Sequence, residues 1–404
     1  MVWMIDMLRF SSATAGASRK DHPAHGVGVL RAFAGRLDAA GANLTLRGES
    51  GQEIAVGAEP CRAIVVFHSA DALAALATEN HLALAEAYLR GEIDIEGDLL
   101  EVMKVTETLV LEQGWFGRLR LAARLWLRNR AEYDRESAAF HYDRPPEFFL
   151  PWLGRSRCYS HGLFVAEDES LDEAMERKMG TAVERLGLRP GMDVLDMGGG
   201  WGCFVEYAGL RGIHVHAITI SEAQHRFVRA LIEEKQLPCS VELVNFREYR
   251  PVRRFDAAVF MGTFEHNPEY GRAAEFLRHN LVPGARVWAD FCAQRVDFTI
   301  GRFMKKYLWP GPTRYVNPYR LMEAFVRAGF NVHEMRDDTR SYELTTRRWG
   351  DLLEARRKDL AARFGEESVR AFLLFLRGST LFLARNRTQA YHVVMGLEPA
   401  PLGS

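Results

Sequence analysis

The stretch Val194-Leu195-Asp196-Met197-Gly198-Gly199-Gly200-Trp201-Gly202 decides the fold of this chain. An apolar run ends in an acid and then breaks into four glycines within five residues. A hydrophobic strand followed by a glycine turn is how an α/β sheet delivers a backbone loop to a nucleotide-like ligand. Glycines are needed there because a Cβ would block close approach and forbid positive φ angles. The stretch alone predicts either a ligand-binding loop or an ordinary turn, and its surroundings must decide.

Strands and helices alternate on both sides of this stretch. We expect strands over residues 193–197, 215–220, 241–244, 255–260 and 286–291, with helices over 171–188, 203–211, 221–234 and up to 280. Repeated β-α-β units form a parallel sheet that is covered on both faces. The pattern predicts an α/β fold, a doubly wound Rossmann-like domain over residues 141–404 with helical lid insertions. Residues 380–384 and 390–395 are predicted as strands near its end.

The first part of the chain has a different pattern. Short apolar segments at 44–46, 54–56 and 63–67 predict strands. Helical periodicity follows at 70–78 and 81–90. Gly91 ends the second helix, and a short strand is expected after it, within residues 92–98. Residues 11–26 are small and polar and predict a loose lead-in. We therefore expect a small α/β domain over residues 1–110.

Residues 111–140 are predicted to form a basic-aromatic helical linker. Trp115, Trp126 and several leucines alternate with arginines such as Arg120 and Arg124. A helix with arginines on one side and tryptophan and leucine on the other is suited to a membrane interface. The alternative is an interdomain helix whose arginine stems lie over apolar surface.

Composition excludes several classes of protein. A net charge of −1 over 404 residues argues against a nucleic-acid binder, whose footprint is strongly basic. The five cysteines are scattered without a CxxC pair, which predicts a reducing compartment and neither a disulfide framework nor a metal site. No apolar run reaches the roughly 18–20 residues that span a bilayer, and we expect a cytoplasmic protein without a targeting segment.

The glycine turn departs from two well-known nucleotide loops. The dinucleotide fingerprint requires GxGxxG, but Cys203 stands where the third glycine belongs, so a plain NAD-type dehydrogenase is a weaker alternative. A P-loop is excluded because no Gly-Lys-Ser/Thr follows. An acid followed by GxGxG suits a nucleoside without a pyrophosphate, which is the pattern of S-adenosylmethionine methyltransferases.

Three blocks in order carry a more specific resemblance. They are residues 188–202, 218–224 and Gly262-Thr263-Phe264-Glu265-His266, with supporting matches at 87–91, 141–143, 159–160 and 306–310. The chain resembles the cyclopropane-fatty-acyl-phospholipid synthases and mycolic-acid methyltransferases, over most of its length. The resemblance implies S-adenosyl-L-methionine as cofactor.

The resemblance also implies how the cofactor is held. The loop of Gly198, Gly200 and Gly202 is expected at its methionine end, and Asp196 is expected among the residues that bind it. Thr219 and Gln224 are expected near the ribose and adenosine, because a hydroxyl and an amide can bind ribose hydroxyls as a carboxylate does. The resemblance places Asn245 and Phe246 beside the adenine and Tyr159 and Ser160 over the cofactor.

The implied reaction sets further demands. An alkene is a poor nucleophile that develops a carbocation as it accepts a methyl group, so the site needs an apolar tunnel and a base. Several aromatic residues are expected either to line that tunnel or to belong to the core and lid. These are Phe148, Phe149, Trp152, Phe264, Phe303, Tyr307 and Trp309.

The expected base site departs from the family pattern. The family holds a bicarbonate with Cys, Glu, His and Tyr, of which Glu265, next to His266, and Tyr342 match. His161 stands at the cysteine position and Asp290 at the histidine position. Because two carboxylates in one pocket repel an anion, we expect no bicarbonate, with Glu265, Asp290 or His161 removing the proton. The alternative is a structural ion pair between Asp290 and His161.

Together these features predict a C-methyltransferase that acts on the double bond of unsaturated fatty acyl chains of phospholipids. The product is a methyl- or methylene-branched chain or a cyclopropane. We expect peripheral contact with the inner face of the membrane. The sequence is compatible with either a monomer or a homodimer. The alternatives are an enzyme for a soluble unsaturated small molecule and a non-catalytic lipid-binding relative.

Overall fold

The computed structural model describes residues 22–39, 41–58, 60–77, 81–103, 144–294, 302–308 and 315–398. The chain divides into two compact units, Met1–Val110 and Leu111–Ser404. The predicted linker at 111–140 and Trp309 lie outside the described residues. Within the described part of the chain, no helix is long and apolar enough to cross a membrane.

The first unit is built on a four-stranded sheet in the order β2-β1-β3-β4. β1 and β3 run parallel, whereas the other pairs are antiparallel. The predicted strands and both predicted helices are present. The first helix was not predicted, and the expected loose lead-in at residues 11–26 is wrong for residues 22–26, where that helix begins. The elements are α1 (His22–Ala39), β1 (Leu44–Arg47), β2 (Glu53–Val56), β3 (Ala63–Phe67), α2 (Ala70–Ala77), α3 (His81–Leu89) and β4 (Ile93–Gly97).

The second unit contains a seven-stranded sheet in the order β10-β11-β9-β8-β5-β6-β7. The strands β5 to β9 are parallel, and β11 runs antiparallel to both β9 and β10. The predicted doubly wound sheet is therefore confirmed. The strands are β5 (Asp193–Met197), β6 (His214–Thr219), β7 (Ser240–Leu243), β8 (Phe255–Met261), β9 (Leu281–Gln294), β10 (Phe330–Asp337) and β11 (Thr388–Leu397).

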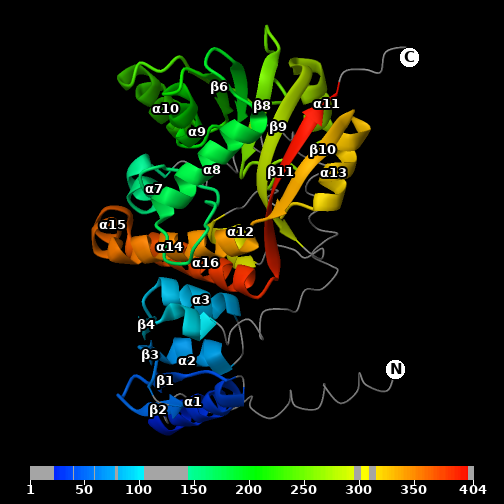
Figure 1. Ribbon diagram of the computed structural model, residues 1–404. Helices are drawn as coiled ribbons and strands as arrows, with labels where there is room; N and C mark the ends of the chain where they lie inside the picture. The colour runs from blue at the N-terminus through cyan, green and yellow to red at the C-terminus, as the bar shows by residue number, and fades with distance from the viewer. Residues whose placement is uncertain are drawn as a thin grey trace, which may run out of the picture. The chain divides into compact units, whose positions relative to one another are not determined.

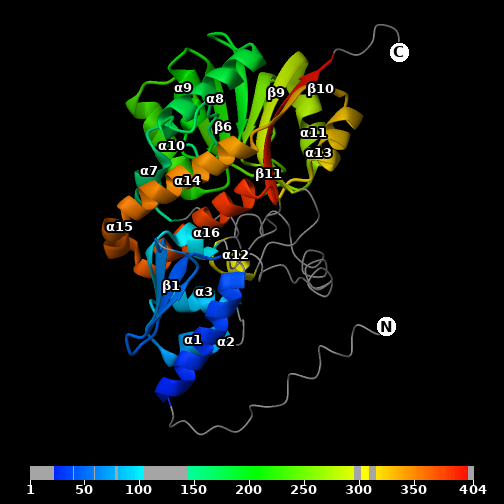
Figure 2. The ribbon, with the colours of Figure 1, turned by 60° about the horizontal axis from the view of Figure 1, so that its bottom comes forward.

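Helices cover both faces of this sheet. Figures 1 and 2 show α8, α9 and α10 on one face and α11 and α13 on the other. The central strands are buried on both sides, as Ala257, Ala258 and Val259 of β8 show with no exposed surface. These helices are α8 (Leu171–Leu186), α9 (Cys203–Gly209), α10 (Glu222–Glu234), α11 (Tyr270–Asn280) and α13 (Pro318–Arg327).

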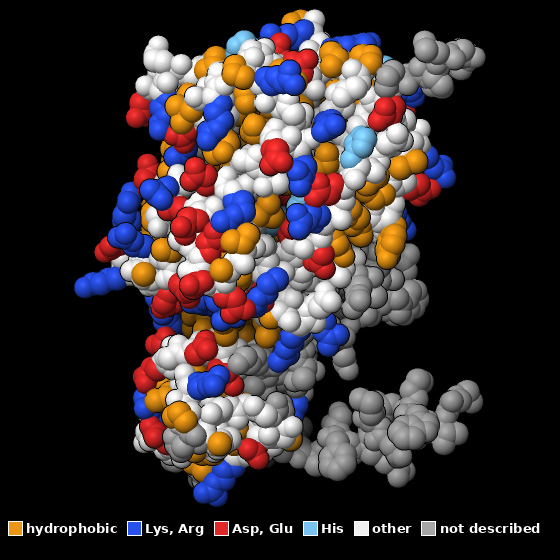
Figure 3. Space-filling model, viewed as in Figure 1, with side chains coloured by type: hydrophobic (Ala, Val, Ile, Leu, Met, Phe, Trp, Pro, Cys, Tyr) orange, Lys and Arg blue, Asp and Glu red, His pale blue; other side chains and the backbone are white. Residues whose placement is uncertain are grey.

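The remaining helices of the second unit are α7 (Pro146–Leu153), α12 (Arg302–Tyr307), α14 (Thr339–Ala355), α15 (Arg357–Phe364) and α16 (Glu366–Ala384). The prediction of a strand at residues 380–384 was wrong, because this run forms the last turns of α16. A short apolar run fits a buried helix as well as a strand. On the face in view, positive and negative side chains intermingle around α14–α16 (Figure 3). Ion pairs of these helices include Arg347–Glu343 within α14 and Arg377–Asp351 between α16 and α14.

Candidate active site

The glycine turn follows β5 and adopts a conformation that requires glycine. Gly198, Gly200 and Gly202 have φ angles of +107°, +51° and +76°, a region that other residues rarely occupy. A Cβ on Gly198 would lie 2.8 Å from the Thr263 hydroxyl oxygen. The amides of Gly198 and Gly199 both donate to the Ile218 carbonyl, at 3.0 and 3.1 Å. The loop is therefore tied to β6 and leaves space beside its backbone.

A pocket opens at this loop. It lies at the carboxyl ends of β5, β6 and β8, where the order of the strands reverses. Ligands of doubly wound sheets bind at such a switch point. All the predicted cofactor residues except Gly202 line the pocket. They are Tyr159, Ser160, Asp196, Gly198, Gly200, Thr219, Gln224, Asn245 and Phe246. Gly202 instead precedes α9 in a left-handed conformation.

Hydrogen bonds within the protein fix several polar groups of the pocket. Thr219 Oγ1 donates to Gln224 Oε1 at 2.9 Å, which leaves the Gln224 NH2 group to donate to a ligand. Ser221 caps α10 by accepting from the Gln224 amide, and this fixes the start of the helix. Asn245 lies after β7 and accepts from the Arg247 amide at 3.0 Å. Burial raises the pKa of Asp196 to about 7.

Glu265 is held in one orientation beside the pocket. Its Oε1 accepts from the Cys292 amide at 2.6 Å, and its Oε2 makes no hydrogen bond to any described residue. Burial raises its pKa to about 7, with a further contribution from the Asp290 charge. The side chain is thus an oriented carboxylate with one unoccupied oxygen.

Asp290 is paired with a lysine that the sequence analysis missed. Lys178 Nζ lies 2.9 Å from Asp290 Oδ2, and neither side chain has any exposed surface. Trp288 Nε1 donates to the same oxygen at 3.1 Å. Burial acts to lower the pKa of Lys178, but the Asp290 carboxylate outweighs it and the pKa rises. The proposed ion pair between Asp290 and His161 is therefore wrong.

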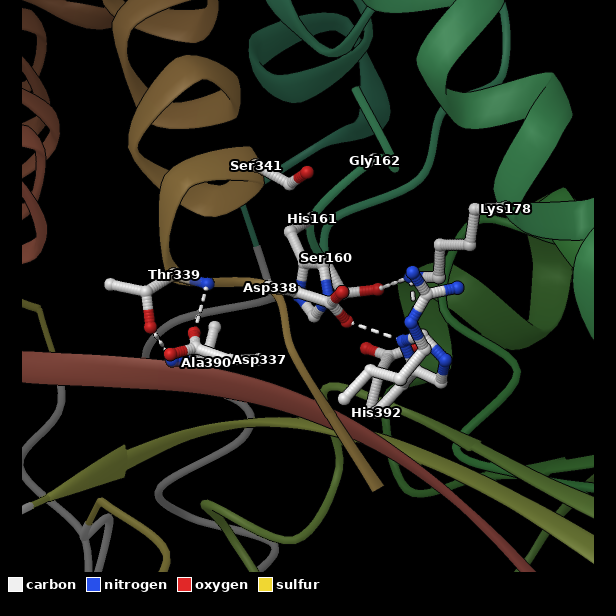
Figure 4. A network of polar contacts seen from close by, with 12 residues as sticks. Ser160, His161, Gly162, Lys178, Asp337, Asp338, Thr339, Ser341, Ala390 and His392 are labelled. Atoms are coloured by element: carbon white, nitrogen blue, oxygen red, sulfur yellow. Dashed lines mark hydrogen bonds and ion pairs between the residues drawn. The ribbon is translucent and has the colours of Figure 1, made fainter. Parts of the chain in front are cut away.

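His161 belongs to a second buried network, which Figure 4 shows with Asp338 between two imidazoles. Asp338 Oδ2 lies 3.0 Å from His161 Nε2 and 2.5 Å from His392 Nδ1. Because a carboxylate accepts, both nitrogens carry protons. Burial acts to raise the pKa of Asp338, but the two histidines hold it well below its usual range. His161 Nδ1 has no partner among the described residues.

The remaining candidates lie close to these groups. The Tyr342 ring is 5.0 Å from the His161 ring. Burial raises the pKa of Tyr342, and the charges of Cys292, Glu265 and Asp290 add to the effect. His266 lines the pocket, and burial lowers its pKa to about 4. The structure thus gathers the five predicted catalytic residues in one region, although only His266 lines the pocket itself.

The aromatic candidates that the structure describes lie either in the core or on α12. Phe148, Phe149, Trp152 and Phe264 have at most 1% exposed surface and do not line the pocket. They pack into the core, for instance with Phe149 and Trp152 against Tyr159. Phe303 and Tyr307 contact each other on α12, with ring centroids 5.3 Å apart. The core interpretation therefore holds for the first four residues.

Three groups near the site escaped the sequence analysis: Lys178, the pair Asp338 and His392, and the pocket residues Thr263 and Asn267. Lys178 had a detectable signal. It falls on the buried stripe of α8, Leu171, Ala174, Met175, Lys178, Met179, Ala182 and Leu186. A cation on such a stripe indicates a buried anionic partner. Asp338 and His392 had none, because 177 residues separate Asp338 from His161.

Comparisons with known proteins agree with this geometry. Residues 129–393 match the family model described as mycolic acid cyclopropane synthetase, and residues 44–109 match a domain of unknown function. The crystal structure of the mycolic acid cyclopropane synthase CmaA1 complexed with SAH and CTAB has a TM-score of 0.60 at 22% identity. It covers 65% of this chain and 98% of that chain.

Two curated relatives are longer than the matched region. A probable fatty acid methyltransferase of Mycobacterium tuberculosis is 29% identical over 65% of this chain and 62% of its own length. A sphingolipid C9-methyltransferase of Gibberella zeae is 24% identical over 77% of this chain and 63% of its own length. The chain thus spans less than two thirds of either relative. Since the family model covers more than half of the chain, the chain belongs to the mycolic acid cyclopropane synthetase family.

Proposed function

We propose that this protein is an S-adenosylmethionine-dependent C-methyltransferase that acts on the double bond of an unsaturated fatty acyl chain, within a phospholipid. Family membership and the names of the fatty acid and sphingolipid relatives support a lipid substrate. The pocket at the switch point supports the cofactor, because Thr219, Gln224 and Asn245 offer the polar atoms that a nucleoside needs. When bound, S-adenosylmethionine supplies an electrophilic methyl group.

Glu265 is the single residue that carries the mechanism. The methylated chain must lose a proton, and a base is effective when its pKa lies near the working pH. The pKa of Glu265 is raised to about 7 by burial, and Oε2 is the oxygen left to accept. Asp290 is a poorer base because Lys178 holds it as an ion pair. Glu265 therefore takes the proton, with His161 as the runner-up.

The residues around Glu265 do not fit a bicarbonate. An anion requires hydrogen-bond donors, whereas Glu265 Oε2 and Asp290 Oδ1 are carboxylate oxygens without partners among the described residues. Lys178 offsets the charge of Asp290, so the repulsion between two carboxylates is weaker than the sequence predicts. The excess of hydrogen-bond acceptors is the stronger reason why bicarbonate does not fit. We therefore propose direct proton removal and a methyl- or methylene-branched product.

The test supplies methyl-labelled S-adenosylmethionine and vesicles of an unsaturated phospholipid to the purified protein. We expect the label in the acyl chain, and mass spectrometry with NMR identifies the product. Adding bicarbonate should leave the rate unchanged. Strong stimulation by bicarbonate with a cyclopropane product would overturn the direct-base mechanism.

Vesicle sedimentation tests the proposed membrane contact separately. We expect the protein to sediment with anionic vesicles through the segment 111–140, whose arginines and tryptophans suit a lipid surface. An enzyme for a soluble alkene would stay in the supernatant and would label no lipid. A non-catalytic relative would show no heat of binding with S-adenosylmethionine in calorimetry.

A further inference from the structure

A fully buried lysine contacts the wall of the cofactor pocket. Lys178 belongs to α8, and its side chain has no exposed surface. Its Nζ lies 2.5 Å from the hydroxyl oxygen of Ser160 (Figure 4), and Ser160 lines the pocket. Lys178 itself does not line the pocket. A ligand would therefore meet Ser160, with the ammonium group directly behind it.

Two further acceptors hold the ammonium group of Lys178 in place. Asp290 Oδ2 lies 2.9 Å from Nζ and also accepts from Trp288 Nε1 at 3.1 Å. Cys158 Sγ lies 3.8 Å from Nζ. An ammonium group has three protons to donate, and Ser160, Asp290 and Cys158 supply an acceptor for each. The position of the ammonium group is therefore fixed by its neighbours.

The lysine decides which role the Ser160 hydroxyl plays. An ammonium group donates and cannot accept, so Ser160 Oγ is the acceptor in this contact. The hydroxyl hydrogen is thereby left for another acceptor, either Cys158 Sγ at 3.5 Å or a ligand in the pocket. Hydrogen bonds to a carboxylate are about twice as strong as those between neutral groups. Ser160 is therefore prepared to donate to a carboxylate in the pocket.

Ser160 and the residues proposed for the nucleoside lie on different sides of the glycine turn. A Cβ on Gly262 would lie 3.0 Å from Ser160 Cβ, and Gly262 directly follows β8. Thr219 ends β6, and Asn245 follows β7. In the sheet order β9-β8-β5-β6-β7, β8 lies on one side of β5, and β6 and β7 lie on the other. With the nucleoside at β6 and β7, the side of Ser160 is left for the amino-acid portion of S-adenosylmethionine.

We propose that Lys178 is a positioning residue for the cofactor, because it fixes the Ser160 hydroxyl as a donor to the carboxylate of the cofactor's amino-acid portion. Lys178 acts through Ser160 and touches no ligand itself. This role rests on the function proposed above, since it concerns the cofactor of the same pocket. The alternative is that Lys178 only pairs with Asp290 and stabilises the fold.

Two ligands separate these alternatives. S-adenosylhomocysteine carries the amino-acid portion, whereas methylthioadenosine has the same nucleoside and a thioether sulfur without it. If Lys178 positions Ser160, removal of the ammonium group should weaken binding of S-adenosylhomocysteine and leave binding of methylthioadenosine unchanged. A protein that is only destabilised would lose affinity for both ligands to the same extent.

The lysine is removed in an Asp290→Asn background, so that the variant holds no unpaired buried carboxylate. Calorimetry on the full-length chain compares Asp290→Asn with the double variant Lys178→Met/Asp290→Asn. We expect the double variant to bind S-adenosylhomocysteine about tenfold more weakly or worse, the effect of losing a hydrogen bond to a charged group. Methylthioadenosine should bind both proteins within about twofold.

Ser160→Ala locates the effect at the hydroxyl group. It should weaken binding of S-adenosylhomocysteine by a similar factor, again without a change for methylthioadenosine. Adding Lys178→Met to Ser160→Ala in the Asp290→Asn background should cause little further loss, because the lysine acts through the hydroxyl. Ser240→Ala is the matched control, since Ser240 is exposed, bonds to His216 and lies outside the pocket. It should bind both ligands as the unaltered protein does.

Three results would overturn the positioning role. Removal of Lys178 could weaken both ligands equally, which is the behaviour of a purely structural residue. It could also leave both affinities unchanged. Finally, the losses from Ser160→Ala and from removal of Lys178 could add up in full, which would show that the lysine does not act through the hydroxyl.

Binding of methylthioadenosine also reports whether each variant is folded. If Lys178→Met/Asp290→Asn does not fold, Lys178→Gln in the same background removes the ammonium group with a polar side chain, and the same ratio of affinities is expected. An unchanged affinity of Ser160→Ala for S-adenosylhomocysteine overturns the positioning role by itself, since the lysine would then have no donor to position. Failure of the unaltered protein to bind either ligand refutes the proposed function instead.

Discussion

At the scale of single residues, Asp196 has a raised pKa that its position in the sequence does not reveal. The sequence predicts Asp196 at the end of a buried strand beside the glycine turn. Only the structure shows that burial raises the pKa of this carboxyl to about 7. The exposed fraction of a side chain depends on everything packed around it, and no local pattern encodes that.

The pKa of Asp196 predicts how stability changes with pH. The unfolded chain loses this proton near its ordinary value of 3.8, whereas the folded chain keeps it to about 7. Stability therefore falls as pH rises through this window. At about 1.4 kcal/mol per pKa unit, the buried charge costs about 4 kcal/mol at pH 8.

Asp196→Asn should remove this cost. We expect the free energy of unfolding of the variant, relative to the unaltered protein, to be higher at pH 8 than at pH 5.5. Urea denaturation at the two pH values measures the difference. The lowered pKa of His266 acts in the opposite direction, but it is common to both proteins and cancels. An equal difference at both pH values would contradict the prediction.

Glu265→Gln tests the proposed base. An amide of similar shape keeps the contact with the Cys292 amide but cannot take a proton, so kcat should fall by about 10²–10⁴-fold while cofactor affinity is preserved. In the unaltered enzyme, kcat should decline as pH drops below about 7, because Glu265 becomes protonated. Steady-state rates over pH 5–9 provide the measurement.

A matched control is Glu275→Gln, a half-exposed carboxylate on α11 that faces Arg278 and His279. Its kcat and pH profile should equal those of the unaltered enzyme. If Glu265→Gln kept the rate and the pH dependence, His161 would become the leading candidate for the base.

At the scale of elements, the prediction is correct where apolar residues recur with a clear period. It fails where a short segment lacks one. The strands β5 and β8 are short runs of mostly apolar residues, and such runs suit buried parallel strands. The end of α16 has a similar composition but completes a 19-residue helix. The residues of α1 preceding Leu30 include two glycines and few apolar side chains, so no helical stripe was visible.

The packing of α8 against β9 contains a buried ion pair whose two partners are far apart in the sequence. Lys178 of α8 and Asp290 of β9 form an ion pair without exposed surface. Removing one partner of a buried pair leaves the other charge uncompensated, at a cost of about 3–5 kcal/mol. Lys178→Met should therefore lower the free energy of unfolding by about that amount.

A double-mutant cycle separates the pair from simple loss of packing. Lys178→Met combined with Asp290→Asn should cost less than the sum of the single changes, because neither charge is stranded. Arg229→Met provides the control, since Arg229 and Glu233 form an exposed pair on α10, and it should change stability by about 0–1 kcal/mol. If the stability losses of the two single variants add up to that of the double variant, Lys178 and Asp290 do not interact energetically.

At the scale of the whole molecule, the sheet order brings distant residues together. Asp290 and His392 are partners in neighbouring strands β9 and β11, and Asp338 reaches His392 across 54 residues of sequence. The position of the cofactor pocket follows from the strand order of the doubly wound sheet. The alternation of strands and helices predicts that class of sheet, but not the order of its strands. The network behind it depends on tertiary contacts between single side chains, and these have no period in the sequence.

The division of the chain predicts that the second unit is sufficient for ligand binding. The seven-stranded sheet, the pocket and the five candidate catalytic residues all belong to residues 111–404. A protein of residues 111–404 should therefore unfold cooperatively. It should bind S-adenosylhomocysteine within about fourfold of the full chain, a difference below about 1 kcal/mol. Calorimetry on both proteins measures this.

Gly198→Val in the same shortened protein is the negative control. Its φ of +107° and the Thr263 hydroxyl 2.8 Å from the position of a Cβ leave no room for a side chain, so binding should be lost. If residues 111–404 bound the ligand far more weakly than the full chain while folding cooperatively, residues 1–110 would contribute to the affinity. The sheet and its glycine turn would then not be sufficient to form the site.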